Sequence, residues 1–381
     1  MQTQAIAWGD SLTFDTGFPI GANRSGVCKW LDFGGTNECV YFADVVTSKK
    51  IMLFSSTGKL LHTVPLGEAM DSLRQIAGIA ILHPDTIVLC GMYNNKIAIV
   101  DRTGRCSVVA DLTASLHRAD GLAYELWPSV FSPFVLGGRA CFQVALIANS
   151  IDGYHGHDVP HGDEVYRYEW LNRNGPHCVS FPLNKIGDNL DITWGPAASQ
   201  KDTSNGIAII DRHQSYACLN GQWFDFSINS PKIRVLDPIS MIAYREFTVR
   251  SANSEVYREP IMIPKGGIAA LHDSVDDRLY NGGFIETIHF DRPTQHYLVV
   301  LRHRLIRDAE SGKVLHSGYT VQEYDVGFNF IQEAAITDHK HLMPFMLCLT
   351  NGTFVLRTEG KRERIRGIHV FDRISFNGNE K

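Results

Sequence analysis

The sequence predicts an all-β fold in which about six copies of a four-stranded unit form a ring, the arrangement called a β-propeller. The segment 75–112 contains four short runs rich in β-branched residues, separated by turn residues, which is typical of an antiparallel meander. A turn motif that ends the third run recurs along the chain. The length of 381 residues also exceeds the roughly 250–300 that one hydrophobic core usually serves, so several small cores are expected.

The segment 75–112 defines the repeating unit. Its predicted strands are 75–82, 86–90, 96–100 and 107–110. His-Pro-Asp, Tyr-Asn-Asn and Asp-Arg-Thr-Gly separate them, and all three are turn sequences. The unit therefore accounts for each apolar run in this part of the chain.

The units can be counted from six turns of one kind. Each turn has a hydrophobic residue, then Asp or a relative, two further residues, and then Gly or Ser. They lie at 54–58, 100–104, 171–175, 236–240, 324–328 and 371–375, and at 324–328 the match is loose because the Gly comes one place early. Their spacing is uneven, which predicts a single propeller domain over residues 1–381 with insertions near 150–165, 185–204 and 251–283. Because the interval before the fifth turn is nearly two units long, seven blades are the alternative to six.

The final unit has no room for a fourth strand after its turn at 371–375. An open sheet edge promotes aggregation, and the N-terminal segments 5–8 and 12–14 are strand-like. The sequence therefore predicts that the N-terminal strand closes the ring.

Composition excludes some classes of protein. Hydrophobic residues make up 44% and charged residues 20%, and the formal net charge of −5 argues against nucleic acid or an anionic membrane as a partner. No apolar run reaches the roughly 18 residues of a membrane helix. Without a basic N-terminal region, a cytoplasmic monomer is expected, with its eight cysteines reduced.

Three stretches carry a family resemblance. The runs 41–44 with 50–59, and 95–104, resemble blades of NHL-type and TolB-like six-bladed β-propellers. The run 204–208 is similar to the Asn-Gly-Leu/Ile-Ala sequence that opens a blade in the gluconolactonase and regucalcin family. That resemblance implies that Asn205 is one ligand of a central divalent cation, although the family's early Glu-Gly-Pro motif has no counterpart here.

A first candidate site is the loop 155–164, which contains His155, His157 and His161 together with three carboxylates. These are the ligand types that zinc, iron or manganese take, and glycines allow a loop to fold around an ion. The loop is expected between the second and third strands of its unit. The alternative is a polar surface loop whose histidines cap turns.

A second candidate site is expected where chain segments enter innermost strands. Asp120 and Asn205 each precede a glycine at such a point, and Glu333 follows the fifth turn, with His339 and His341 nearby. The prediction is that they converge at the mouth of the central channel, as oxygen ligands for calcium or magnesium or as a carboxylate base. The alternative is ordinary turn chemistry of Asx-Gly pairs.

The sequence contains no Gly-x-Ser-x-Gly, Walker-type or His-Glu-x-x-His motif. We expect an enzyme or small-molecule binder that uses the channel mouth for hydrolase, lyase or cyclase chemistry. The cofactor left open is a divalent cation, Ca²⁺, Mg²⁺, Zn²⁺ or Mn²⁺, and no organic cofactor is implied. The alternative is a non-catalytic scaffold that binds a protein or peptide.

Overall fold

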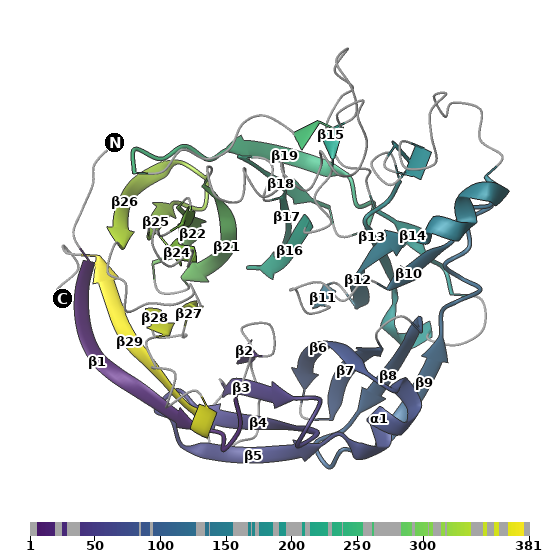
Figure 1. Cartoon of the computed structure of the whole chain (residues 1–381), viewed down its shortest axis with the longest axis horizontal. Helices are drawn as coiled ribbons and strands as arrows, with labels where there is room; N and C mark the ends of the chain where they lie inside the picture. Colours follow the sequence, from purple (N-terminus) through teal and green to yellow (C-terminus); the bar gives the residue numbers. More distant parts are fainter. Residues whose placement is uncertain are drawn as a thin grey trace.

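The computed structural model is an all-β ring of antiparallel sheets, a β-propeller, as the sequence predicts (Figure 1). The structure describes residues 6–19, 25–28, 39–83, 85–91, 94–126, 134–136, 138–154, 167–168, 170–171, 175–185, 190–195, 208–209, 214–227, 231–237, 239–253, 261–262, 283–291, 294–303, 305–307, 314–316, 318–336, 346–348, 354–357 and 365–376. No helix in these ranges is long and apolar enough to cross a membrane.

Two four-stranded sheets come from the first third of the chain. One contains β2 (Ser25–Cys28), β3 (Cys39–Asp44), β4 (Lys50–Ser55) and β5 (Leu60–Pro65). After α1 (Gly67–Leu73), the next contains β6 (Ile76–His83), β7 (Thr86–Gly91), β8 (Lys96–Val100) and β9 (Cys106–Asp111). The β6–β9 sheet confirms the unit predicted at 75–112.

The middle of the chain forms two more large sheets. The first contains β10 (Tyr124–Leu126), β11 (Phe134–Leu136), β12 (Arg139–Leu146), β13 (Cys178–Pro182) and β14 (Thr193–Trp194), with the 3-10 turns Ala148–Gly153 and Leu183–Lys185. The second contains β16 (Gln214–Leu219), β17 (Gln222–Ser227), β18 (Lys232–Leu236) and β19 (Ala243–Thr248).

Two four-stranded sheets complete the ring. One contains β21 (Phe284–Asp291), β22 (His296–Arg302), β25 (Tyr319–Tyr324) and β26 (Phe330–Ile336). The other contains β27 (Met346–Cys348), β28 (Phe354–Arg357), β29 (Ile368–Phe376) and β1 (Ile6–Asp15). Two short pairs lie outside these sheets: β15 (Ala208–Ile209) with β20 (Ile261–Met262), and β23 (Leu305–Arg307) with β24 (Val314–His316).

The predicted count of six or seven four-stranded blades is wrong. Within the described ranges, five sheets have four strands. The β10–β14 sheet has five, because β10 and β11 both pair with β12. The long β12 therefore has two short strands beside it, where the sequence pattern predicted one.

Four of the six predicted turns end a third strand. Asp101 is typical: its backbone oxygen accepts a hydrogen bond from the Gly104 amide at 2.9 Å, and its side chain accepts one from the Thr103 amide at 2.8 Å. Gly104 has φ +84°, and a Cβ there would overlap the Pro65 carbonyl of the neighbouring sheet. Glycine is required at this position by both backbone conformation and packing.

Two of the predicted turns are wrong. Leu171 and Gly175 both precede β13, so the turn at 171–175 does not follow the third strand of its sheet. The turn at 371–375 lies inside β29, where Asp372 pairs with Ser11 of β1. Hydrogen bonding to the N-terminal strand keeps this Asp-containing segment extended, which local turn propensity alone does not reveal.

The N-terminal strand β1 pairs with β29 from Ile6–Phe376 to Asp15–Ile368. Phe14 is fully buried, and its ring centroid lies 5.2 Å from that of Phe42, on β3, and 5.6 Å from that of Phe371, on β29. The two segments lie side by side in Figure 1. Whether the ring depends on this pairing stays a prediction.

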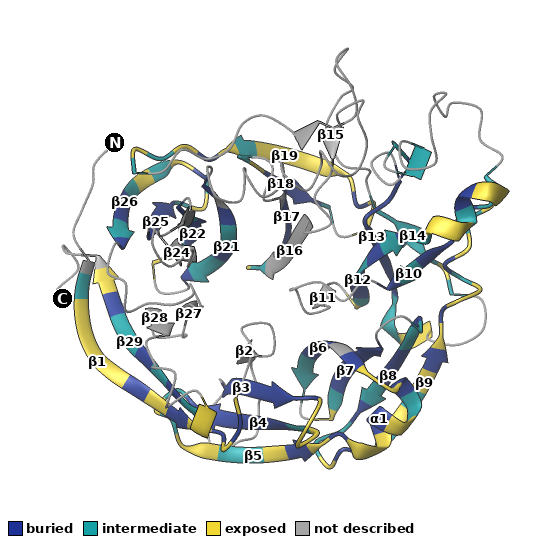
Figure 2. Ribbon diagram, in the orientation of Figure 1, coloured by how far each residue is buried: buried dark blue, intermediate teal, exposed yellow. Residues whose placement is uncertain are grey.

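The core consists of apolar clusters between neighbouring sheets. Leu53 and Ile76 belong to the cluster between the β2–β5 and β6–β9 sheets, and Leu298 and Ile374 to the cluster between the last two sheets. Figure 2 shows buried residues along middle strands such as β3, β4 and β7, and exposed residues along β1, β5 and β19. The sheets are thus stabilised by packing face to face around the ring.

Candidate functional site

Three titratable side chains of β21 distinguish it from the other described strands near the centre of the ring: Glu286, His289 and Asp291. β21 is an edge strand of its sheet and lies on the side towards the ring centre (Figure 1). Glu286 Oε2, His289 Nε2 and Asp291 Oδ1 are each buried without a hydrogen-bond partner in the described part of the chain. Burying such a group without a partner costs about 1–3 kcal/mol, so three on one strand require an explanation.

The fold places these residues on β21 through its register. His289 lies opposite Leu298 of β22, which packs in the cluster shared with Ile374 of β29. Since alternate residues of a strand share a face, His289 and Asp291 both face the neighbouring β27–β29 sheet. Glu286 sits at a bulge, where the register shifts between Ile285 and Thr287. The bulge changes the direction of the Glu286 side chain from the one that regular strand pairing would give it.

Glu286 lies beside a buried cation. Its Oε2 is 3.7 Å from Arg302 Nε, which is too long for a hydrogen bond. Burial raises the pKa of Glu286, and the charge of Arg302 offsets part of that increase. Burial also raises the pKa of Tyr319, which lies opposite Arg302 in the β22–β25 register, and the charge of Glu286 raises it further. Glu286 is therefore a carboxyl group poised to hold a proton.

His289 is neutral at physiological pH. Burial lowers its pKa from 6.5 to about 4. A neutral imidazole has one donor and one acceptor nitrogen, so the buried Nε2 is able to bind either a hydroxyl group or a carbonyl group. His289 therefore adds a second hydrogen-bonding group, three residues from Glu286 on the same strand.

Asp291 is the last of the three buried titratable residues on β21. Burial raises its pKa, a hydrogen bond from Thr294 opposes this, and the charge of Glu323 raises it again. Thr294 Oγ1 donates to Asp291 Oδ2 at 2.5 Å, while Glu323 Oε1 lies 2.5 Å from His296 Nδ1. Glu323 thus has its own partner, and Asp291 keeps one buried oxygen that no described residue pairs with.

The predicted position of Glu333 at the channel mouth is wrong. Glu333 lies on β26, the opposite edge of the sheet from β21, and is fully buried. Its carboxylate accepts hydrogen bonds from the Ala252 amide at 2.8 Å, Asn253 Nδ2 at 3.1 Å and Gln322 Nε2 at 2.7 Å. These contacts join the segment that follows β19 to the β21–β26 sheet, which is a structural arrangement. The catalytic role predicted for Glu333 stays untested.

Asp120 lies in the tight turn before β10, as the sequence predicts. Its Oδ2 accepts a hydrogen bond from Arg118 Nε at 3.0 Å, and its Oδ1 accepts one from the Leu122 amide at 3.2 Å. The Arg118 guanidinium also lies over the Trp194 ring, 5.7 Å from its centroid. These contacts match the turn-chemistry alternative, and they leave a ligand role for Asp120 as a prediction.

The other predicted site residues lie outside the described residues: Asn205, His155, His157, His161, His339 and His341. In the sequence, the loop 155–164 falls between β12 and β13, which are the second and third strands along their sheet, as predicted. The step at 207–208 does not enter an innermost strand, because β15 pairs with β20 while β16 is the edge strand of its sheet. In the described part of the chain, no group of three His, Cys, Asp or Glu side chains is arranged to hold a metal ion.

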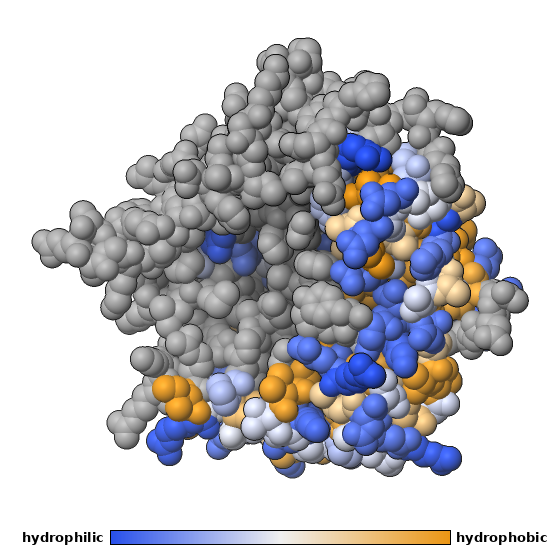
Figure 3. Space-filling view, turned by 45° about the vertical axis from the view of Figure 1, so that its right-hand side comes forward, coloured by the Kyte–Doolittle hydropathy of each residue, from blue (hydrophilic) through white to orange (hydrophobic). Residues whose placement is uncertain are grey.

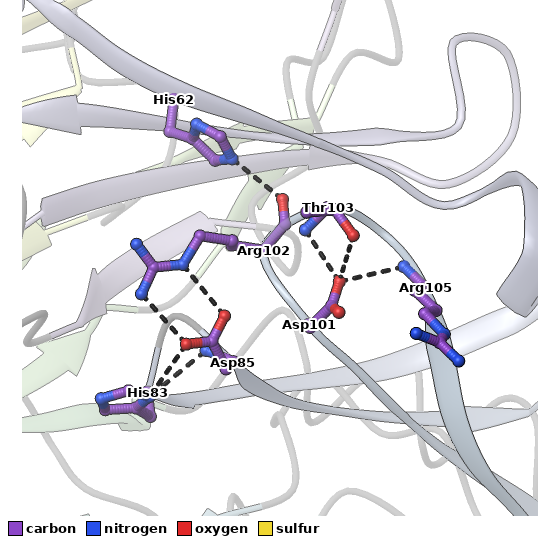
Figure 4. A network of polar contacts seen from close by, with 7 residues as sticks. All are labelled: His62, His83, Asp85, Asp101, Arg102, Thr103 and Arg105. Atoms are coloured by element: carbon purple, nitrogen blue, oxygen red, sulfur yellow. Dashed lines mark hydrogen bonds and ion pairs between the residues drawn. The ribbon is translucent and has the colours of Figure 1, made fainter.

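The polar residues of the β6–β9 sheet behave differently from those of β21. Figure 4 shows them in the turns, where each carboxylate already has donors. Arg102 makes a two-pronged contact with Asp85, Nε to Oδ1 at 2.9 Å and Nη2 to Oδ2 at 3.0 Å. His62 Nε2 lies 2.9 Å from the Arg102 carbonyl oxygen. Hydrogen bonding from Arg102 lowers the pKa of Asp85.

Sequence reasoning missed Glu286, His289, Asp291 and Arg302. A signal was present: the run Phe-Ile-Glu-Thr-Ile-His-Phe-Asp is a strand-like stretch with three titratable residues and directly follows the predicted insertion at 251–283. The sequence predicts the site residues in loops, whereas Glu286, His289 and Asp291 lie within a strand.

No protein-family profile and no curated protein matches the chain. A solved structure of a DUF4221 family member from Bacteroides vulgatus is similar, with a TM-score of 0.64 at 11% identity over 98% of this chain and 99% of that one. A luciferin-regenerating enzyme gives a TM-score of 0.43 at 8% identity, covering 97% and 96%. A streptogramin B lyase gives 0.41 at 12%, covering 96% and 98%. The first likeness shows that the chain has a β-propeller fold.

Proposed function

We propose that this protein binds a small polar molecule along β21 and transforms it by proton transfer, in hydrolase, lyase or cyclase chemistry. The observation that carries the proposal is the row of buried, incompletely bonded titratable groups on the innermost strand of the sheet. A ligand that donates and accepts hydrogen bonds would offset their desolvation. Perturbed titratable groups concentrate at functional sites.

Glu286 is the proton-transfer group in this proposal. A carboxyl group with a raised pKa gives up and takes back a proton near neutral pH more readily than an ordinary glutamate does. Arg302, within 4 Å, would stabilise negative charge that develops on a substrate oxygen. The substrate class that fits is a small molecule with a carbonyl or carboxylate oxygen next to an acidic C–H or a hydrolysable bond.

His289 would orient the substrate, not exchange protons with it. Its low pKa keeps it uncharged over the working range, so it contributes a fixed hydrogen bond. Asp291, at the far end of the strand, offers a second acceptor for a hydroxyl or amino group. The three side chains favour a polar substrate with several hydrogen-bonding groups.

A divalent cation remains part of the proposal only through the predicted ligands Asn205, Asp120, His155, His157 and His161. Elemental analysis of tag-free protein purified without chelator, compared with a variant in which all three histidines are alanine, tests it. We expect zinc or manganese in the first and loss of it in the second. Equal metal content in both proteins, or none in either, removes the loop as a metal site.

The function is tested by incubating the protein with a mixture of small carbonyl compounds, lactones and hydroxy acids and following substrate loss by mass spectrometry. Glu286→Gln should lower the rate by about 10²–10⁴-fold. Glu246→Gln is the matched control, because Glu246 is on the exposed β19 and pairs with Lys232 at 2.6 Å. A rate unchanged in Glu286→Gln contradicts the assignment.

The alternative, a non-catalytic scaffold, is favoured by one observation. Ile242 and Tyr244, at the start of the outer strand β19, are 66% and 58% exposed. If the protein is a scaffold, replacing these two residues should weaken partner binding while Glu286→Gln leaves it unchanged. Partner binding by these two variants, the double replacement on β19 and Glu286→Gln, thus distinguishes a scaffold from an enzyme.

A further inference from the structure

A groove of about 770 Å³ lies at the turn end of the β6–β9 and β10–β14 sheets. Its lining includes Asp85, which follows β6, Leu183, which follows β13, and Ile239, in the turn between β18 and β19. Glu286 lies near the beginning of β21, so it is at the other end of a different sheet. The groove is therefore separate from the site on β21, and its volume is within the range of small-molecule sites.

The walls of the groove are largely apolar. Ile99 on β8, Pro182, Leu183 and Ile239 line it, and Ile239 is 69% exposed. The described surface that Figure 3 displays mixes orange apolar and blue polar side chains, without a large region of one kind. A ligand of the groove would therefore need an apolar body of limited size.

One positive charge in the lining has no carboxylate partner within the described ranges of the chain. Arg139 Nε donates to Ser180 Oγ at 3.0 Å, and its Nη2 donates to the Ser180 carbonyl at 3.0 Å and to Thr193 Oγ1 at 2.7 Å. All three acceptors are neutral. Among the residues that the structure describes, Arg139 has no ion pair, and its Nη1 donates to no acceptor.

The other charges at the groove cancel each other. Asp85 forms its two-pronged contact with Arg102, so the carboxylate is already neutralised (Figure 4). The groove thus combines apolar walls with one guanidinium that is held in place by neutral acceptors. Nη1 is the guanidinium nitrogen left to donate a charge-assisted hydrogen bond to a carboxylate, and a preoriented group loses less entropy when it does so.

We infer that the groove is a second binding site, for a small organic carboxylate with an apolar body of the size of a medium-chain fatty acid. The carboxylate would bind at Arg139, and the chain would cover Ile99, Leu183 and Ile239. The inference does not depend on the function proposed for β21.

Isothermal titration calorimetry with octanoate tests it, with acetate lacking the apolar body and octylamine reversing the charge. We expect saturable 1:1 binding of octanoate and none of the other two. Ile239→Asp should weaken octanoate binding at least about 10-fold, because it replaces an apolar wall of the groove by a carboxylate, which has the same sign of charge as octanoate. Val326→Asp is the matched control: Val326 is also exposed, at 53%, but does not line the groove, so binding should be unchanged.

Arg139→Gln should weaken octanoate binding to a similar extent. Since this variant also loses contacts to Ser180 and Thr193, its circular dichroism and melting temperature must be compared with wild type. Ile239→Asp keeps the test valid if Arg139→Gln misfolds, because Ile239 is exposed. No binding of octanoate to wild type, equal binding of octylamine, or equal loss in Ile239→Asp and Val326→Asp overturns the inference.

Discussion

The β6–β9 sheet and the β21–β26 sheet have the same four-stranded order but place their carboxylates differently. In the first, Asp85 and Asp101 lie in exposed turns, and hydrogen bonds from Arg102 and Thr103 lower their pKa values. In the second, Glu286 and Asp291 lie within or at the end of the inner strand, and burial raises their pKa values. The direction of the shift separates carboxylates that stabilise turns from carboxylates with unused hydrogen-bonding capacity.

The difference extends to the strands themselves. β6 contributes the apolar side chains Ile76, Ile79 and Ala80 to the packing between sheets. β21 contributes Ile285 and Ile288 on one face, but Glu286 and His289 are not part of any apolar cluster. One sheet is built for packing alone, whereas the other gives up packing energy on one face. Such a loss is expected where a site needs polar groups.

The largest effect should come from the N-terminal strand, on which both sheets would depend if it closes the ring. Phe14→Ala should lower the free energy of unfolding by about 3–5 kcal/mol, because Phe14 is fully buried among aromatic rings. Urea denaturation measures this. Trp8→Ala, at a site 43% exposed on the same strand, is the control and should cost much less. Equal, small effects would mean that the fold does not depend on this strand.

Leu89→Ala probes the packing sheet. Leu89 is fully buried on β7, and its truncation should cost about 2–5 kcal/mol. The loss should be the same at pH 5 and pH 8, since the cluster that contains Leu89 includes no carboxylate or imidazole side chain. Chemical denaturation at both pH values checks this, and a strong pH dependence would contradict a purely apolar role.

His289→Leu probes the other sheet and should act in the opposite direction. Replacing a buried imidazole whose Nε2 has no partner among the residues that the structure describes by an apolar side chain should raise the free energy of unfolding by about 1–3 kcal/mol. The pKa of His289 is lowered from 6.5 to about 4, so wild type loses stability as pH falls through this window. The advantage of His289→Leu should therefore grow between pH 6.5 and 4. A variant that is less stable than wild type throughout would show that His289 has a structural partner.

Asp101→Asn should give the smallest effect. Hydrogen bonds from Thr103 and Arg105 lower the pKa of Asp101 below 3.8, so its stabilising effect is present above that pH and is lost as the pH falls. The variant should melt slightly below wild type at pH 7, and the two should converge in acid. Thermal melts at pH 7 and pH 3 measure the difference. A larger loss than that of Leu89→Ala would overturn the comparison.

Much of the fold could be predicted because its signals are local. The β-branched runs at 75–112 and the Asp101 turn specify the β6–β9 sheet, and the strand-like segment at 12–14 falls within β1. The Phe371–Ser375 segment was mispredicted because its pairing partner is at the other end of the chain. Non-local pairing of this kind overrides turn propensity.

The candidate site could not be predicted for a related reason. The raised pKa of Glu286 depends on burial and on Arg302 and Tyr319, which lie on other strands. Glu333 looked equally suitable in the sequence, but the amide of Ala252 and the side chains of Asn253 and Gln322 occupy its carboxylate. Only the packing distinguishes a carboxylate with complete partners from one without.

The most direct test measures turnover and stability of Glu286→Gln side by side. Because the pKa of Glu286 is raised above 4.5 in the folded protein, its carboxylate destabilises the fold as pH rises above that value. We predict that Glu286→Gln loses turnover about 10²–10⁴-fold while its free energy of unfolding at pH 8 equals or exceeds that of wild type. The stability difference should disappear towards pH 4. Unchanged turnover, or a variant less stable than wild type at pH 8, would contradict the account.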